Sequence, residues 1–243
     1  MSKEFWSFRG EGAERDLFLT NEISGRSSWW DDTVTPNQFR YQLFSGRGEV
    51  RVWIDSPGGD AFAGAAIYEM LREYSRVEGN RTVAMITLAA SAASLIAMAC
   101  DEIRISVVGT IMIHEPWSAV AGKAVEHRAT AEVLENIRAA QIHAYSQRTG
   151  QSEEKILELM QGTDGSGTYM NAKMAMEMRF ADVLIDDDEE MIGTMAMARV
   201  ASLMRAEDGP EEPEEPAAPE EPGTRAADEA RVRLMKSALM AEI

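Results

Sequence analysis

A serine and a histidine 23 residues apart are the residues of this chain best suited to chemistry. Ser91 stands in the fragment AASAA (89–93), where an apolar run typical of a strand (83–88) changes into one typical of a helix (94–100). Such a turn exposes a hydroxyl and directs helix amides at a reacting carbonyl. Serine attacks a carbonyl when a base takes its proton, and His114 can do so if the two strands are neighbours. The spacing therefore predicts nucleophilic chemistry by a hydroxyl.

Three other residues bear on this pair. Gly58 and Gly59 follow an apolar strand, and their missing side chains let backbone approach a ligand closely. Ser94 is the rival nucleophile, but it lies about one turn inside the expected helix, where its hydroxyl can bond a carbonyl. Ordinary helix filling is the alternative for Ser91, and a buried core histidine is the alternative for His114. Their joint occurrence with the two glycines favours the chemical interpretation.

The expected chemistry requires neither an organic cofactor nor a metal ion. His127 and His143 fall on roughly opposite faces of one expected helix, which makes them poor partners in a metal site. The acidic run 186–190 could attract a cation, but runs of charge are usually solvated. We therefore expect no metal site.

Composition and charge limit the class of protein. The chain has 243 residues, 45% of them hydrophobic, which is enough for one large domain and an appendage. Its net charge of −17 is concentrated in residues 186–222, which hold thirteen acidic residues and two arginines. A negative chain without a basic patch argues against nucleic acid as a partner. Cys100 is the only cysteine, so no intrachain disulfide can form, and a reducing, cytoplasmic location is expected.

One segment must be weighed as a membrane span. Residues 83–100 are eighteen residues without a charge. Their alanine, serine and threonine content makes them weakly hydrophobic, and no aromatic belt flanks them, so no membrane association is expected. The first ten residues contain no continuous apolar core, so a secretion signal is not expected either.

Strand-like and helix-like patterns alternate along most of the chain. Strands are expected at 17–23, 50–54, 83–88, 102–106, 110–114 and 181–185. Helices are expected at 36–44, 63–74, 94–100, 124–148, 153–160 and 171–178, with a glycine-rich loop at 162–167. The alternation predicts an α/β fold with parallel crossover connections.

The chain resembles the Clp-type (caseinolytic) serine peptidases in four ordered segments. These are IDSPGGDAFAGAAIYEML (54–71), TLAASAASLIAMACDEI (87–103), MIHEPW (112–117) and YMNAKMAMEMRFAD (169–182). Any one motif alone would be weak evidence, whereas the ordered set is specific. The chain is most similar to the Clp-related head maturation proteases of tailed phages and prophages, and the similarity covers roughly residues 15–185. It implies an α/β fold of the Clp/crotonase type, a superhelix of repeated β-β-α units with a protruding handle helix from Ala124.

The resemblance also implies roles for single residues. Ser91 aligns with the family's nucleophile and His114 with its general base. Gly59 and Ala92 match the positions whose backbone amides form the oxyanion hole, and so contact the substrate. The stretch 117–123 matches the segment that pairs with substrate as an added β-strand.

The third member of the catalytic triad departs from the family pattern. Counting back from Tyr169 places the family's acid on Gly167, which has no side chain. The chain carries a small insertion at 162–167, so Asp164 could reach His114 from a rearranged loop. The alternative is an ordinary turn aspartate. Arg179 also replaces a glycine that is usual in the family.

The function implied is that of a serine endopeptidase that forms an acyl-enzyme on a protein or peptide substrate. The implied partners are further copies of the chain in a homo-oligomeric ring, phage capsid or scaffold proteins, and an ATP-dependent unfoldase. Two alternatives stay open at this point. One is a crotonase-like enzyme acting on acyl-coenzyme A, and the other is a catalytically weak or inactive assembly protein of the same fold.

The composition divides the chain into four regions. A peptidase domain is expected at 1–190, followed by a Met-rich helical segment at 191–206. Residues 207–225 form an expected acidic, proline-rich linker that cannot bury enough apolar surface to fold. Residues 226–243 show the pattern of an amphipathic helix. That helix is either a docking element or a loosely ordered terminus.

Overall fold

The structure is a computed structural model, and it describes residues 5–10, 14–24 and 36–185. The segments expected at 191–206, 207–225 and 226–243 lie outside the described residues, as does the acidic run 186–190. The strands are β1 (Trp6–Arg9), β2 (Glu14–Thr20), β3 (Glu49–Ser56), β4 (Arg81–Ala90), β5 (Glu102–Ile113), β6 (Thr168–Asn171) and β7 (Val183–Ile185). The helices are α1 (Pro36–Leu43), α2 (Ala61–Ser75), α3 (Ala92–Ala97), α4 (Ala124–Thr149), α5 (Glu153–Gln161) and α6 (Ala172–Glu177).

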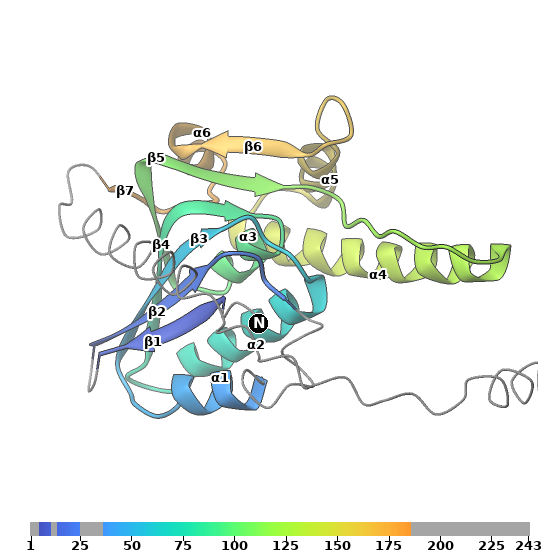
Figure 1. Cartoon of the computed structure of the whole chain (residues 1–243). Coiled ribbons are helices and arrows are strands. Elements are labelled where there is room, and N and C mark those ends of the chain that lie inside the picture. The colour runs from blue at the N-terminus through green and yellow to red at the C-terminus, as the bar shows by residue number, and fades with distance from the viewer. Residues whose placement is uncertain (1–4, 11–13, 25–35, 186–243) are drawn as a thin grey trace, which may run out of the picture. The chain divides into compact units, whose positions relative to one another are not determined.

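A twisted seven-stranded sheet forms the centre of the fold (Figure 1). Strands β2, β3, β4 and β5 are parallel neighbours. At the two edges, β1 pairs antiparallel with β2, and β6 pairs antiparallel with β5. Strand β7 pairs parallel with the first half of β5, and β6 pairs with the second half of β5. Helix α1 lies between β2 and β3 in the chain, α2 between β3 and β4, and α3 between β4 and β5, as crossover connections require. The expected mixed α/β fold class is confirmed.

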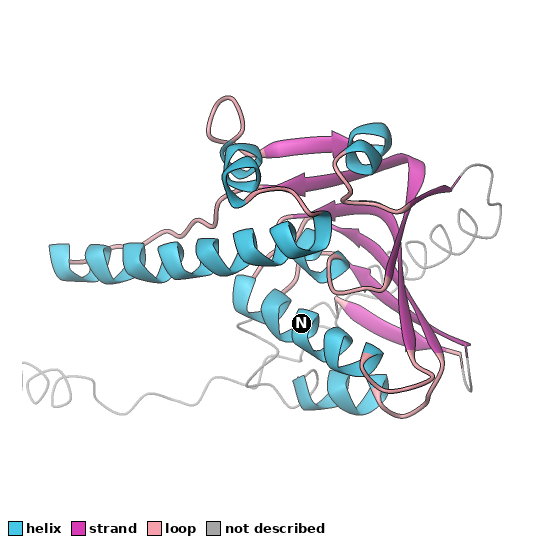
Figure 2. Ribbon diagram, turned by 180° about the vertical axis from the view of Figure 1, so that it is seen from behind, coloured by secondary structure: helices cyan, strands magenta, loops and turns pink. Residues whose placement is uncertain are grey.

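Alternating side chains place most of the core on one face of the sheet, the face that the helices cover (Figure 2). Val52 and Ile54 of β3 belong to the large core cluster, whereas Trp53 between them joins a small cluster on the other face. Strand β4 behaves in the same way, with Ile86 in the large cluster and Met85 in the small one. Successive strand residues point to opposite faces, so near-continuous apolar runs are needed where both faces are buried.

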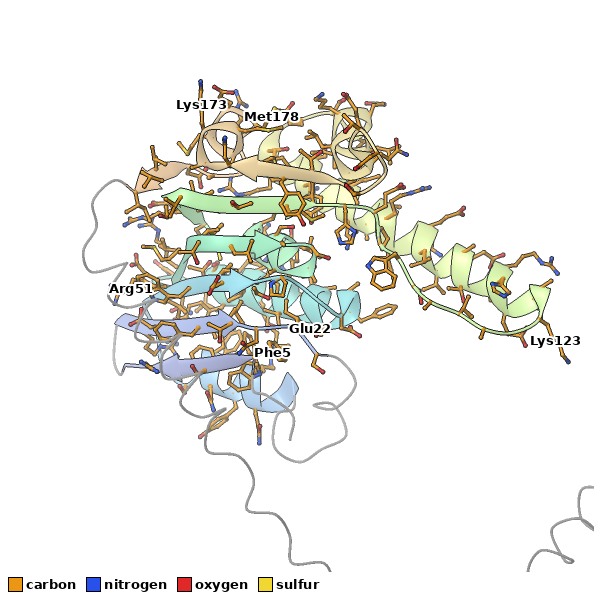
Figure 3. The ribbon with its side chains drawn as sticks, turned by 45° about the horizontal axis from the view of Figure 1, so that its top comes forward. Phe5, Glu22, Arg51, Lys123, Lys173 and Met178 are labelled. Atoms are coloured by element: carbon orange, nitrogen blue, oxygen red, sulfur yellow. The ribbon has the colours of Figure 1, made fainter. Side chains whose placement is uncertain are left out.

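Helix α4 projects well beyond the rest of the described domain (Figure 1). Its buried residues all lie between Gln141 and Thr149, near its C-terminal end. Lys123, which precedes its first turn, lies at the far tip (Figure 3). Gly150 ends the helix with a left-handed φ of 70°, a conformation that glycine adopts without strain. The expected protruding helix is therefore present.

The segments that sequence patterns misplaced are short or bent. The strands expected at 102–106 and 110–114 are one strand, β5, whose pairing with β4 slips between Ile86 and Leu88. Gly109 allows that bend, because a Cβ there would lie 2.6 Å from Ile105 Cγ1. The four-residue strands β1 and β6 carry too few residues for a recognisable alternation.

The apolar stretch 83–100 is divided between β4, a turn and α3. Within the described residues, no helix combines the length and the apolar character needed to cross a membrane.

Candidate active site

Three segments meet where parallel strands β3, β4 and β5 end. Gly58 and Gly59 follow β3, Ser91 follows β4, and His114 follows β5. The strands are in register at this edge, with Ser56 opposite Ala89 and Ala90 opposite Met112. The carboxyl ends of parallel strands are the usual place for ligand sites in α/β sheets. These residues are far apart in the sequence, and the pairing of the three strands brings them together at one edge of the sheet.

Ser91 lies in a sharp turn that the surroundings hold in place. Its φ of 54° and ψ of −125° are outside the ordinary regions for a non-glycine residue. The Ser91 amide donates to the Met112 carbonyl at 2.8 Å, and the Ser94 hydroxyl donates to the Ser91 carbonyl at 2.6 Å. A Cβ on Gly58 would lie 2.5 Å from the Ala90 carbonyl oxygen, so a glycine is needed beside the turn. Backbone strain of this kind persists where the surroundings over-determine it.

The Ser91 hydroxyl and the His114 imidazole form a hydrogen bond. The distance from Ser91 Oγ to His114 Nε2 is 2.7 Å, within the range for a nucleophile and its base. His114 is half-buried, and this burial lowers the pKa of its imidazole below the ordinary value, while a contact with the Glu115 backbone acts in the opposite direction. The shift favours the neutral ring, which is the form that can accept a proton.

Two backbone amides border the same space. Ala92 is the first residue of α3, so its amide has no carbonyl partner within the helix. Gly59 forms a β-bridge with Ile23, in which Ile23 donates to the Gly58 carbonyl and Asp60 donates to the Ile23 carbonyl. Successive amides of an extended chain point in opposite directions, so the Gly59 amide faces away from Ile23. A Cβ on Gly59 would lie 2.1 Å from the Ile23 carbonyl oxygen.

A cavity of about 270 Å³ extends from Ser91 and His114 to α4. Gly59 and Ala92 line it near the serine. Leu134, Ile137, Gln141 and Tyr145 line it from α4. These four α4 residues are three or four positions apart and so share one helix face. A substrate group bound next to Ser91 would thus contact the inner face of the projecting helix.

Ser94, the rival nucleophile of the sequence analysis, has a buried hydroxyl with two partners. It donates to the Ser91 carbonyl, and it lies 2.9 Å from the Tyr145 hydroxyl. Burial raises the pKa of Tyr145 to about 12, so this phenol stays protonated. Ser94 and Tyr145 therefore connect the Ser91 turn to α4.

The structure does not bring Asp164 to His114. The Asp164 carboxylate is exposed and accepts hydrogen bonds from the Ser166 amide at 3.0 Å and the Ser166 hydroxyl at 2.6 Å, which lower its pKa. The residue that does abut the histidine is Gly167, where a Cβ would lie 2.5 Å from His114 Cβ. The position expected for the family's acid thus lies beside the Cα and Cβ of His114 but has no side chain.

The remaining residues with potential reactivity lie apart from this site. His143 bonds Gln147 at 2.9 Å and lies 3.6 Å from a Glu153 carboxylate, and His127 is exposed on α4. In the part of the chain that the structure describes, no three histidine, cysteine or acidic residues are grouped to hold a metal ion. Burial raises the pKa of the Cys100 thiol to about 12, which leaves it without nucleophilic character near neutral pH.

Sequence analysis did not single out Gln141. It is 8% exposed, and its side-chain oxygen accepts no hydrogen bond within the described part of the chain. A signal was present in the sequence, since Gln141 is the one carboxamide in the helical series formed with Leu134, Ile137 and Tyr145.

Comparison with known proteins identifies the family. Residues 13–188 match the family described as Clp protease. The chain is 32% identical over 165 residues to the ATP-dependent Clp protease proteolytic subunit 2 of Treponema denticola, an alignment that covers 67% of this chain and 78% of that protein. It is 28% identical over 144 residues to the ATP-dependent Clp protease proteolytic subunit of Borreliella afzelii, with coverages of 59% and 71%. It is 27% identical over 176 residues to the ATP-dependent Clp protease proteolytic subunit 1 of Streptomyces avermitilis, with coverages of 70% and 78%. The chain therefore belongs to the Clp protease family, whose members are serine peptidases.

Proposed function

We propose that Ser91 and His114 hydrolyse peptide bonds by way of an acyl-enzyme. The observation that carries this proposal is the 2.7 Å hydrogen bond between Ser91 Oγ and His114 Nε2 at the mouth of a cavity. Ser91 Oγ attacks the peptide carbonyl while His114 takes its proton, and a new C–O bond forms. The imidazolium then gives that proton to the leaving amine as the C–N bond breaks.

The second half of the reaction uses the same groups. A water molecule attacks the ester carbonyl, and His114 accepts one of its protons. The C–O bond to Ser91 then breaks, the serine recovers that proton from the imidazolium, and the peptide leaves as a carboxylic acid, which ionises by giving its remaining proton to solvent. Only water is consumed, and Ser91 and His114 end in the protonation states in which they began.

The negative oxygen formed in each half needs hydrogen-bond donors. We assign the Gly59 and Ala92 amides to this role, since both border the cavity beside Ser91 and neither is directed at a secondary-structure partner. Removing one such donor in an acyl-transfer enzyme costs about 10² to 10³ in kcat. The close packing of Gly59 against Ile23 holds its amide in position.

The identity of a third catalytic residue stays a prediction. Asp164 is bonded to Ser166, and Gly167 occupies the position beside His114. We therefore propose the Ser91–His114 pair as the reacting groups and treat Asp164 as a residue whose part depends on a rearrangement of the 162–167 loop.

Labelling separates the two candidate nucleophiles. A serine-reactive phosphonate is expected to modify Ser91, and Ser91→Ala should abolish both labelling and peptide cleavage, with a loss of about 10⁶ in kcat as for other serine nucleophiles. Ser94→Ala is the comparison variant, because it removes the neighbouring hydroxyl and its bond to the Ser91 carbonyl but keeps Ser91 Oγ, so labelling of Ser91 should persist even if the rate falls. Cleavage that survives Ser91→Ala, or labelling of Ser94 instead, would refute the assignment.

Of the functions that the sequence left open, the peptidase has the support of the family, and neither the acyl-coenzyme A enzyme nor the inactive assembly protein gains any from it. We further propose that the chain works as a homo-oligomeric ring. The projecting part of α4 carries exposed apolar side chains, with Val125 59% and Val133 46% exposed, which suits contact with further copies. Native mass spectrometry should show an oligomer, and a monomer that retains full activity would contradict this proposal.

The natural substrate is the most specific part of the proposed function, and two observations point to different substrates. The similarity of the four motifs to phage head maturation proteases favours capsid or scaffold proteins as substrates. The names of the relatives, which include the term ATP-dependent, favour instead an unfoldase as a partner. The two are separated by incubating the enzyme with a folded capsid precursor, with and without an ATP-driven unfoldase. Cleavage that needs no unfoldase and disappears in Ser91→Ala supports the maturation role, and cleavage only with the unfoldase argues against it.

A further inference from the structure

Gln141 carries an unpaired polar atom beside the apolar side chains of Leu134 and Ile137, which line the cavity with it. Its side-chain oxygen is buried and has no hydrogen-bond partner in the described part of the chain. Leu134 and Ile137 precede it along the same helix face. Buried polar groups are nearly always paired in native proteins, and an exception calls for an explanation. An unmade bond inside a ligand cavity suggests that the ligand supplies the partner.

The part of a substrate that reaches Gln141 follows from the position of Ser91. The attacked carbonyl lies at Ser91 Oγ, beside the Gly59 and Ala92 amides. The nearest side chain belongs to the residue whose carbonyl is attacked, which is the residue on the N-terminal side of the cleaved bond. The cavity that opens from Ser91 toward α4 is therefore the place for that side chain.

Tyr145, the other polar group on this part of the helix face, is already satisfied. Its hydroxyl is 2.9 Å from Ser94 Oγ, and Ser94 in turn donates to the Ser91 carbonyl. Tyr145 thus serves the architecture of the turn. The side-chain oxygen of Gln141, one helical turn earlier, has no such partner in the described part of the chain, so a substrate can supply one.

We infer that Gln141 selects a side chain with an apolar stem and a terminal carboxamide, namely glutamine, on the N-terminal side of the cleaved bond. This inference rests on the proposed function. The stem contacts Leu134 and Ile137, and the terminal amide bonds the amide of Gln141. The last torsion of a glutamine side chain is broad, so Gln141 can present its oxygen or its nitrogen to the cavity. A carboxamide both donates and accepts, so it complements either orientation.

The expected preference for glutamine over methionine follows from the side chain of Gln141, which a methionine substrate would leave without a hydrogen bond. Methionine is unbranched and of similar length to glutamine, but it fills the cavity without a hydrogen bond to Gln141. A site built to bond a polar substrate group rejects the analogue that lacks it, because its own buried group then stays unpaired. We expect kcat/KM for a peptide with glutamine to exceed that for methionine by about tenfold.

The test uses two otherwise identical fluorogenic peptides, with glutamine or methionine before the cleaved bond. Each is assayed with the full-length wild type, with Gln141→Met and with Gln147→Met. Gln147 is an exposed glutamine on the same helix, so its replacement is a matched control. The wild type and Gln147→Met should prefer glutamine by about tenfold. Gln141→Met should prefer methionine or show no preference.

The wild-type ratio alone can overturn the inference, so it does not depend on how Gln141→Met folds. Cleavage that is equal for the two peptides, or faster for methionine, would refute it, as would a preference for glutamine that survives Gln141→Met. Phosphonate labelling of Ser91 together with cleavage of either peptide would in that case leave the proposed function intact. No cleavage of either peptide and no labelling of Ser91 would overturn the proposed function and this inference together.

Discussion

The two sides of His114 are built in opposite ways. On one side lies the Ser91 turn, packed against Gly58 and tied to the Met112 carbonyl by a 2.8 Å hydrogen bond. On the other lies the 162–167 loop, which is largely exposed, contains three glycines with positive φ and is joined to α5 by the Gly162 and Gly167 amides. The nucleophile is held by backbone contacts that tolerate no extra atom, whereas the only carboxylate of the loop bonds a neighbouring serine.

The difference shows which interactions of the site depend on the fold and which depend on a local loop. Ser91 and His114 meet because β4 and β5 are neighbours, with Ala90 opposite Met112, so the sheet sets the positions from which the two side chains reach each other. The loop approaches His114 at Gly167, where a Cβ would lie 2.5 Å from His114 Cβ and 2.9 Å from its Cα. A precise nucleophile–base pair therefore does not require an equally precise acid.

The largest effect is expected from one methyl group added beside the Ser91 turn. In Gly58→Ala the new Cβ would lie 2.5 Å from the Ala90 carbonyl oxygen and 2.6 Å from Ser91 Cβ, at a φ of +94°. We expect a loss of about 3 kcal/mol in the free energy of unfolding, measured by urea titration. Displacement of Ser91 by about 1 Å should lower kcat/KM by about 10² or more.

Gly165→Ala is the matched control in the loop. Its φ of +82° carries the same kind of backbone strain, but no atom lies within 4 Å of the added Cβ. We expect a stability loss of about 1 kcal/mol with unchanged kcat/KM. Equal losses of activity in the two variants would contradict the comparison, because the loop would then matter as much as the turn.

The pH profile measures the environment of His114 itself. The imidazolium cannot accept the Ser91 proton, so kcat/KM falls about tenfold for each pH unit below the pKa of His114. Burial lowers that pKa from its usual value of 6.5, so the midpoint of the rising limb should lie below pH 6.5. Measuring kcat/KM from about pH 4.5 to 8 tests this sign. A midpoint above 6.5 would indicate a carboxylate close to the imidazole, as the triad would place it.

The smallest effect is expected from Asp164→Asn. The variant retains a side-chain oxygen for the Ser166 bonds and removes the negative charge. Because the described loop keeps Asp164 away from His114, we expect kcat/KM within about twofold of the wild type, measured with the same peptides. A fall of about 10⁴ would show instead that the loop rearranges and that Asp164 completes the triad.

Sequence patterns predicted most long elements because each buries a regular series of side chains. The apolar series of α2 and the alternation in β3 are examples, and both lie within a few residues of their expected ends. Strands β1 and β6 were not recognised, since four residues carry little periodic signal and their pairing is decided by β2 and β5. The slip in β5 was read as a break for a similar reason, because Gly109 looks the same at a bend as at a strand end.

Residue types and their order by themselves determined the candidate nucleophile, base and glycines, since small residues around a serine and a glycine pair after a strand are local features. Only the tertiary structure decided which of them meet. The 2.7 Å bond between Ser91 and His114 depends on the register of β4 with β5, and the separation of Asp164 from His114 depends on how the 162–167 loop closes. The unpaired oxygen of Gln141 is likewise invisible along the chain, because hydrogen-bond satisfaction is a property of neighbours in space.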